Sequence, residues 1–138
     1  DFGWCAELTD SSGPRKTFCG TWDYLSPEVV DNQPHDRGVD VWAAGVLVFE
    51  MLAGRAPFAA PRQAETVARI RVVDLSFPGH VSQSARDLVR RILVKDTHQR
   101  LSLQEARRHP WVSEHAPSPP SPPQAAAAPL ARQPSPVA

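Results

Sequence analysis

The sequence has only two cysteines and no excess of charge of either sign. Cys5 and Cys19 do not form a CxxC pair, and the five histidines do not stand at metal-ligand spacing from them, which argues against a zinc site. Free thiols in a reducing compartment are favoured over a disulfide, which stays open as the alternative. Because the formal net charge is zero, nothing indicates nucleic acid or a membrane surface as a partner.

Long hydrophobic runs are also absent. The longest apolar stretch covers residues 41–49 and is interrupted by Gly45. A membrane-spanning helix needs roughly 18 to 20 apolar residues, so we expect no membrane span. The 138 residues, of which 41% are hydrophobic, suffice for one domain of ordinary size.

The composition changes sharply near Glu114. Residues 116–138 hold eight of the fifteen prolines, one charged residue (Arg132) and no aromatic residue. Such a segment cannot bury enough apolar surface to offset its ordering entropy, which predicts a disordered Pro/Ala-rich tail. Its overlapping PxxP patterns suit SH3- or WW-type grooves, and an inert tail is the simpler alternative. The predicted division is therefore 1–115 and 116–138.

Four stretches before the tail have helical patterns. Residues 38–54 are apolar nearly all round, which is typical of a helix buried on every side. Gly54 and Pro57 mark the end of this helix. Since only three later helices remain to cover it, we expect part of its surface to lack a cover within this chain.

The other three predicted helices are shorter and amphipathic. The last of them begins with Ser102 and Glu105 at capping-box spacing and ends at Pro110. The three cover residues 61–73, 82–93 and 102–110. Residues 1–36 show no sustained period, which predicts a long loop of the kind that carries function.

Several short motifs follow one another in a fixed order. A lone DFG is a weak signal, but here it precedes four others, which are "TFCGTWDYLSPE", "VDVWAAG", "HQRLS" and "HPWV". In this order they resemble protein kinases, from the magnesium-binding DFG to the end of the large lobe. Trp4, "RKTFCGT" and "HDRGVDVW" are similar to Aurora kinases, and the resemblance covers about residues 1–115.

The resemblance implies a mainly α fold. This fold would be part of a kinase large (C-terminal) lobe, with the activation segment, four helices and the tail. Two positions depart from the usual pattern: Ser26 replaces a proline or alanine, and Trp22 replaces a smaller aliphatic residue.

The first three residues would form the cofactor site under this resemblance. Asp1 would bind the Mg²⁺ that bridges the ATP phosphates, because a carboxylate is a hard oxygen ligand. Phe2 would set the position of Asp1, and Gly3 would let the backbone turn. The implied cofactors are ATP and Mg²⁺, and the implied partners are protein substrates.

Two threonines have implied roles in the activation segment. Thr17 would be the phosphorylated threonine, since a phosphate there can order the loop by pairing with arginines. Thr21 would line the place that receives the substrate hydroxyl, which is typical of Ser/Thr specificity.

Three charged residues have implied structural roles. Glu28 and Arg100 would form a buried ion pair that ties the activation segment to the lobe. Asp40 lies near the start of an apolar helix and would need hydrogen-bond donors, which in kinases are backbone amides of the catalytic loop.

Other kinase motifs do not occur in this sequence. There is no GxGxxG loop, no VAIK-type lysine and no HRDxxxxN loop, all of which precede DFG in kinases. We therefore expect the general base to lie upstream, and the chain to be an inactive fragment by itself. Three hypotheses remain for the nature of the chain: a partial gene product, a short isoform that acts as a non-catalytic interaction module, and a pseudogene fragment.

The resemblance to Aurora kinases also implies a place in the cell. It predicts action in mitosis and a location in the nucleus, at the spindle or centrosome, or on chromosomes, with the cytoplasm as the alternative.

Overall fold

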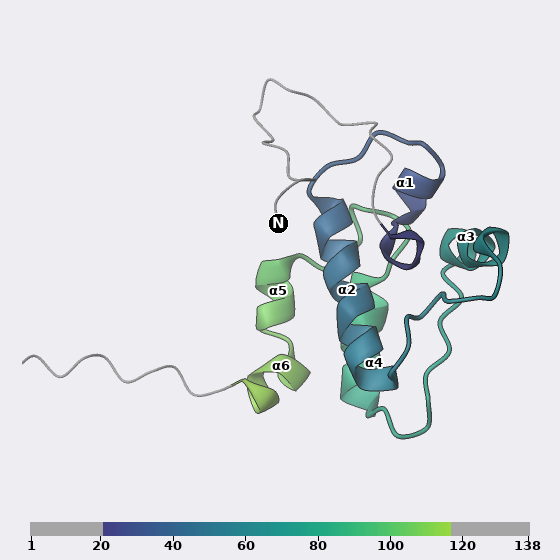
Figure 1. Ribbon diagram of the computed structural model, residues 1–138. Helices are drawn as coiled ribbons and strands as arrows, with labels where there is room; N and C mark the ends of the chain where they lie inside the picture. The colour runs from purple at the N-terminus through teal and green to yellow at the C-terminus, as the bar shows by residue number, and fades with distance from the viewer. Residues whose placement is uncertain (1–20, 117–138) are drawn as a thin grey trace, which may run out of the picture.

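The long helix α2 (Gly38–Ala53) runs through the middle of the molecule, and the other elements lie around it (Figure 1). The structure is a computed structural model that describes residues 21–116. The other elements are η1 (Trp22–Tyr24), α1 (Pro27–Val30), α3 (Gln63–Val72), α4 (Gln83–Ile92), α5 (Leu103–Arg107) and α6 (Pro110–His115). Residues 21–116 contain no β-strand, so the predicted mainly α fold class is confirmed.

Single residues determine where α2 ends and where α4 begins. Gly54 ends α2 with a φ of 74°, in the left-handed region that glycine adopts without strain, and its N–H donates to the Glu50 carbonyl at 2.8 Å. Ser82 precedes α4, and its hydroxyl accepts the Ala85 N–H at 3.2 Å. Both boundaries agree with the predicted helices.

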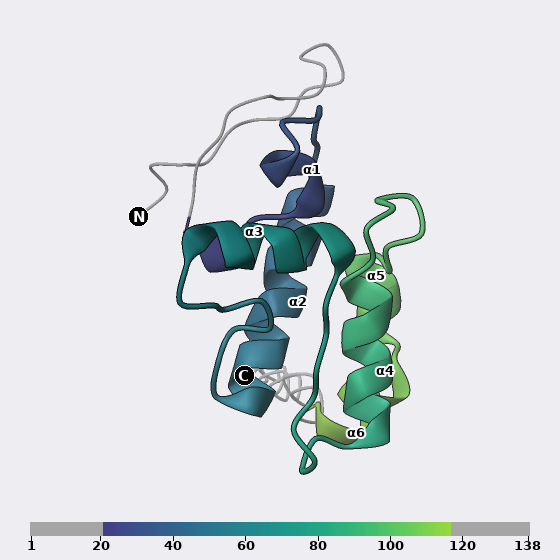
Figure 2. The ribbon, with the colours of Figure 1, turned by 90° about the vertical axis from the view of Figure 1, so that its right-hand side faces the viewer.

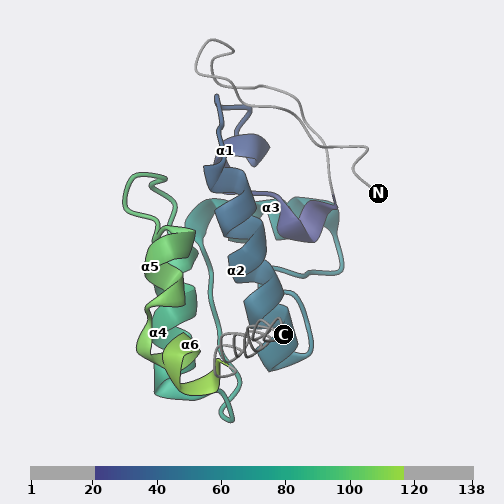
Figure 3. The ribbon, with the colours of Figure 1, turned by 90° about the vertical axis from the view of Figure 1, so that its left-hand side faces the viewer.

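Helix α4 is the later helix that packs beside α2, and it runs in the opposite direction (Figure 2). Helix α3 packs against α1 and η1. The two short helices α5 and α6 lie together along α4 (Figure 3). This arrangement covers α2 from one side.

The core lies between α2, α3 and α4. Its larger cluster is made of seven buried side chains, which are Trp42, Val46, Phe49, Phe58, Ile70, Val89 and Leu93. The rings of Trp42 and Phe58 are stacked with their centroids 5.5 Å apart. A smaller cluster of Leu88, Ile92 and Ala106 joins α4 to α5. Burial of these apolar side chains is the main force that holds the helices together.

The other side of α2 is uncovered among the described residues. Leu47 is 48% exposed and Met51 is 70% exposed, although both belong to the apolar helix. Asp40, in the first turn of the same helix, is exposed as well. As far as residues 21–116 are concerned, part of this helix thus lacks a cover, which agrees with the expectation for the chain.

The number of helices differs from the sequence prediction. The segment predicted as loop contains η1 and α1, the last predicted helix (102–110) is observed as α5, and a further helix, α6, follows it. Pro110 separates α5 from α6, because proline has no N–H and disfavours helical geometry in the residue before it. His109 is accordingly extended (φ −62°, ψ 138°), and Pro110 starts a new helix. The capping box of Ser102 and Glu105 forms as predicted.

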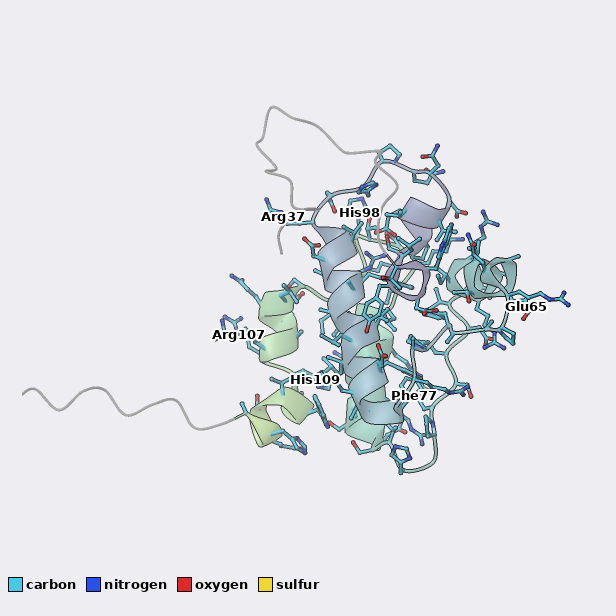
Figure 4. The ribbon with its side chains drawn as sticks, in the orientation of Figure 1. Arg37, Glu65, Phe77, His98, Arg107 and His109 are labelled. Carbon is cyan, nitrogen blue, oxygen red and sulfur yellow. The ribbon has the colours of Figure 1, made fainter. Side chains whose placement is uncertain are left out.

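His109 joins the corner between α5 and α6 to α4. It lies at this corner, on the side that faces the body of the molecule (Figure 4). Its Nε2 lies 2.9 Å from Asp87 Oδ2, and its Nδ1 accepts the Trp111 N–H at 3.3 Å, which assigns the ring proton to Nε2. The hydrogen bond from His109 lowers the pKa of the Asp87 carboxyl, and Arg91, 3.0 Å away, lowers this pKa further.

Gly45 marks the closest approach of α2 and α4. A Cβ atom at this position would lie 2.5 Å from Ile92 Cγ2 and 2.9 Å from Leu93 Cδ2. We predict that Gly45→Ala lowers the free energy of unfolding by about 1–3 kcal/mol, because the packed core must shift. Urea unfolding followed by tryptophan fluorescence measures this change. Gly79→Ala is the control, since nothing lies within 4 Å of its Cβ position; equal stability of the two variants would contradict the prediction.

Asp87 should give the fold a dependence on acid pH. A lowered folded pKa stabilises the fold above the unfolded pKa of about 4, and this stabilisation is lost as the pH falls through the folded pKa. We predict that Asp87→Asn makes the loss of stability below about pH 4 less steep. Thermal unfolding between neutral and acid pH measures this slope. Asp74→Asn should keep the wild-type slope, because it removes a carboxylate charge that forms no ion pair with any described residue.

Candidate functional site

A buried ion pair connects α1 to the loop that follows α4. Arg100 Nη1 lies 2.9 Å from Glu28 Oε1, and Arg100 Nη2 lies 3.1 Å from Glu28 Oε2. The two residues are 72 positions apart, and their side chains are only 1% and 9% exposed. The two-pronged geometry fixes both the distance and the orientation of the carboxylate.

Arg100 also donates to two backbone carbonyls. Its Nη1 donates to the Gly38 carbonyl at 2.7 Å, and its Nε donates to the Val94 carbonyl at 3.1 Å. The guanidinium lies 5.1 Å from the Trp42 ring centroid, within reach of a cation–π contact. One side chain therefore joins α1, the start of α2, and the loop after α4.

The residues before α1 form a short, anchored turn. Thr21 is exposed and precedes η1, where its carbonyl accepts the Tyr24 N–H at 3.0 Å. The Tyr24 hydroxyl donates to the Glu50 carboxylate of α2. This hydrogen bond, with smaller contributions from burial and from the charges of Glu50 and Asp23, raises the pKa of Tyr24. The turn that carries Thr21 is thus fixed to α2.

Two buried polar atoms have no hydrogen-bond partner among residues 21–116. They are the hydroxyl of Ser26, which is 1% exposed, and the indole Nε1 of Trp42, which is fully buried. The Ser26 side chain does not cap α1, although the residue occupies the N-cap position. Such atoms destabilise a fold because they lose their hydrogen bonds to water.

Asp40 does not join this group. Its side chain is exposed, and no described residue donates a hydrogen bond to its carboxylate. The implied donors of Asp40 belong to a catalytic loop that does not occur in the sequence, so its role stays a prediction. The structure therefore brings Glu28 and Arg100 together, fixes the turn that carries Thr21, and leaves Asp40 apart.

The remaining predicted site residues lie outside the described residues. These are Asp1, Phe2, Gly3 and Thr17, and the same holds for residues 117–138 of the proline-rich tail. Among residues 21–116, no group of three or more His, Cys, Asp or Glu side chains could hold a metal ion. The described residues thus carry no argument for a Mg²⁺ site. No helix within residues 21–116 has the length and hydropathy of a membrane span.

Sequence reasoning missed the bond between Tyr24 and Glu50. One signal was available, because Glu50 is the only acid in the apolar stretch 41–53 and an acid there needs a donor. The distance of 26 positions between the two residues hid which donor it would find.

The comparisons with known proteins agree on one family. The family described as "Protein kinase domain" matches residues 1–112. The chain is 45% identical to Aurora kinase C of Mus musculus, 46% to Serine/threonine-protein kinase Aurora-2 of Arabidopsis thaliana and 41% to Aurora kinase of Dictyostelium discoideum. Each match covers 84% of this chain, but only 41%, 41% and 30% of the respective relative. The chain thus spans well under half the length of these relatives.

The buried ion pair generates a prediction about stability. Glu28→Gln leaves the Arg100 charge buried without its partner, so we expect it to lower the free energy of unfolding by about 3–5 kcal/mol. Glu28→Leu combined with Arg100→Met removes both charges and should be less destabilising than Glu28→Gln. Urea unfolding compares the variants. A double variant as unstable as the sum of the Glu28→Leu and Arg100→Met single variants would show that the two charges are not coupled.

Ser26 generates a second prediction. Ser26→Ala removes a buried hydroxyl without a partner, so we expect the free energy of unfolding to rise by about 1 kcal/mol. Ser76→Ala, at an exposed position, should change it by less than about 0.5 kcal/mol. Thermal unfolding of both variants measures the difference. A loss of stability in Ser26→Ala would mean that the hydroxyl has a partner.

Proposed function

Because the chain belongs to the protein kinase family and is similar to Aurora kinases over most of its length, we propose that it is part of an Aurora-type Ser/Thr kinase. The parent protein transfers the γ-phosphoryl group of ATP to Ser or Thr hydroxyls of protein substrates. ATP and Mg²⁺ are its cofactors, since the metal offsets the charge of the transferred group.

The observation that carries the proposal is the two-pronged bond between Glu28 and Arg100. It fixes α1 to the body of the lobe, and the bond between Tyr24 and Glu50 fixes the preceding turn. Thr21 is held exposed at the start of this turn. Positioning is a large part of phosphoryl-transfer catalysis, and a rigid surface beside the substrate hydroxyl supplies it.

The residues outside 21–116 take their roles in the proposal from the family. Asp1 holds the Mg²⁺, Phe2 and Gly3 set the position of Asp1, and phosphorylation of Thr17 orders the segment that ends in Thr21. The general base is not among the residues of this chain. We therefore expect the 138-residue chain alone to transfer no phosphate.

A second function is favoured by the uncovered side of α2. Leu47 and Met51 expose apolar surface that a kinase partner could cover, which fits a non-catalytic interaction module. This reading requires the chain to exist by itself as a stable species of about 15 kDa, which immunoblotting detects. A full-length product alone would exclude it.

The cellular role in the proposal rests on the resemblance to Aurora kinases. The parent kinase acts in mitosis, in the nucleus and at the spindle or chromosomes. A fluorescent fusion followed through cell division tests this role, and a location that does not change in mitosis would contradict it.

The full-length protein that contains this chain tests the enzymatic activity. With radiolabelled ATP and Mg²⁺, we expect label on Ser and Thr peptides and none on the matched Tyr peptide. Asp1→Asn should abolish labelling, because the amide is a poorer Mg²⁺ ligand than the carboxylate. Asp74→Asn is the control for loss of an exposed acid. Labelling by Asp1→Asn at the wild-type rate, or preference for the Tyr peptide, would refute the proposal.

A further inference from the structure

We propose that His109 is a proton-sensitive cap of α6, whose unprotonated ring holds the start of this helix and whose protonation at Nδ1 releases α6 from the body of the molecule. The inference goes beyond the proposed kinase function and does not depend on it. His109 lies at the corner between α5 and α6 (Figure 4) and is only 6% exposed, and both of its ring nitrogens have hydrogen-bond partners.

His109 supplies the acceptors for the first N–H groups of α6. Pro110, the first residue of the helix, has no N–H. The N–H groups of Val112 and Ser113 donate to the His109 carbonyl at 2.9 and 3.0 Å. The Trp111 N–H donates instead to the ring, at 3.3 Å from His109 Nδ1. The ring therefore performs the part of an N-cap side chain for the N–H that the backbone leaves over.

The two partners of the ring exclude a second proton while the cap is in place. An ionised carboxylate only accepts hydrogen bonds, so the Nε2 that lies 2.9 Å from Asp87 Oδ2 carries the hydrogen. A backbone N–H only donates, so the Nδ1 that faces Trp111 has a free electron pair. A further proton can bind only at Nδ1, where it places a donor against a donor. Protonation and capping are therefore mutually exclusive.

The charges around His109 do not restore the cap. Asp87 and Arg91 face the corner from α4, and Arg91 Nε lies 3.0 Å from the same Asp87 Oδ2 that His109 contacts. The Asp87 side chain is 47% exposed, so solvent screens its attraction for a protonated ring. The charged and titratable side chains of α5 and α6 are all exposed; they are Glu105, Arg107, Arg108, Glu114 and His115. Protonation thus keeps the contact with Asp87 and loses the one with Trp111.

His115, the other histidine of α6, acts in the opposite direction. Its Nδ1 lies 2.7 Å from the Trp111 carbonyl, which only accepts, so this nitrogen carries the hydrogen. A further proton binds at Nε2 and breaks no hydrogen bond that the described residues make. The positive charge then lies at the last turn of α6, where it stabilises the helix. Acid therefore releases α6 through His109 and not through His115.

Loss of the cap frees a helix that has little stability of its own. Helix α6 has six residues, which is too short for a stable isolated helix. Its Trp111 and Val112 pack against the smaller apolar cluster of α4 and α5. Release of α6 therefore exposes apolar surface on these helices in a narrow range of pH, which makes the corner a device that responds to protons.

The test follows hydrogen–deuterium exchange of the full-length protein that contains this chain, by mass spectrometry of its peptides. The pH is lowered from about 7.5 to about 5.5, where imidazoles take up a proton and carboxylates stay ionised. After correction for the intrinsic pH dependence of exchange, protection of residues 110–116 should fall by about threefold to tenfold, the effect of one helix cap. Protection of α4 should not change.

Two variants assign the effect to a residue. His109→Asn supplies a capping oxygen that does not titrate, so protection of 110–116 should no longer depend on pH in this interval. His115→Gln is the matched control and should keep the wild-type loss. Constant protection of 110–116 in the wild type, a loss that extends over α4, or a loss that His115→Gln abolishes overturns the inference. These three outcomes do not require that His109→Asn folds; a folded His109→Asn that keeps the loss overturns it as well.

Discussion

The bond between Glu28 and Arg100 is the contact on which the arrangement of the described chain depends. A segment of four residues such as α1 cannot form a stable helix by itself, because helix nucleation is unfavourable at this length. The buried carboxylate of Glu28 holds α1 in place from 72 positions away. Arg100 is held in turn by hydrogen bonds from its Nη1 and Nε to the Gly38 and Val94 carbonyls. Such a pair contributes defined geometry more than stability, because burial of two charges is costly.

Helix α2 supplies both contacts that anchor the segment before it. The start of α2 meets Arg100 through the Gly38 carbonyl, and its last turns meet Tyr24 through Glu50. The distance between these anchors is set by the rigid rise of the helix. Trp42 lies between them, stacked on Phe58 and covered by the Arg100 guanidinium. The turn at Thr21 therefore keeps a fixed place relative to the core.

Periodicity and capping residues were enough to place the longer helices. The apolar stretch up to Gly54, the Ser82 cap and the Ser102–Glu105 box each rest on contacts within a few residues, so the sequence contains them. The short helices η1 and α1 escaped prediction because tertiary contacts hold them. The pairing of Glu28 with Arg100 followed only from the resemblance to a family, since no local pattern links residues 72 positions apart. Neither a local pattern nor the family resemblance indicated the hydrogen bond between Tyr24 and Glu50.

The uncovered side of α2 and the two buried polar atoms both reduce the stability of the fold. A helix that is apolar on all faces is stable in water only when every face is covered, yet Leu47 and Met51 are exposed. The Ser26 hydroxyl and the Trp42 indole have the opposite deficiency, since they are buried and no residue of the described part of the chain bonds to them. Apolar surface in water and polar atoms in the core both reduce the net stability of a chain of this size. Because the ion pair adds little stability of its own, the two apolar clusters on α4 must outweigh these costs. The close approach of α2 and α4 at Gly45 packs the larger cluster tightly.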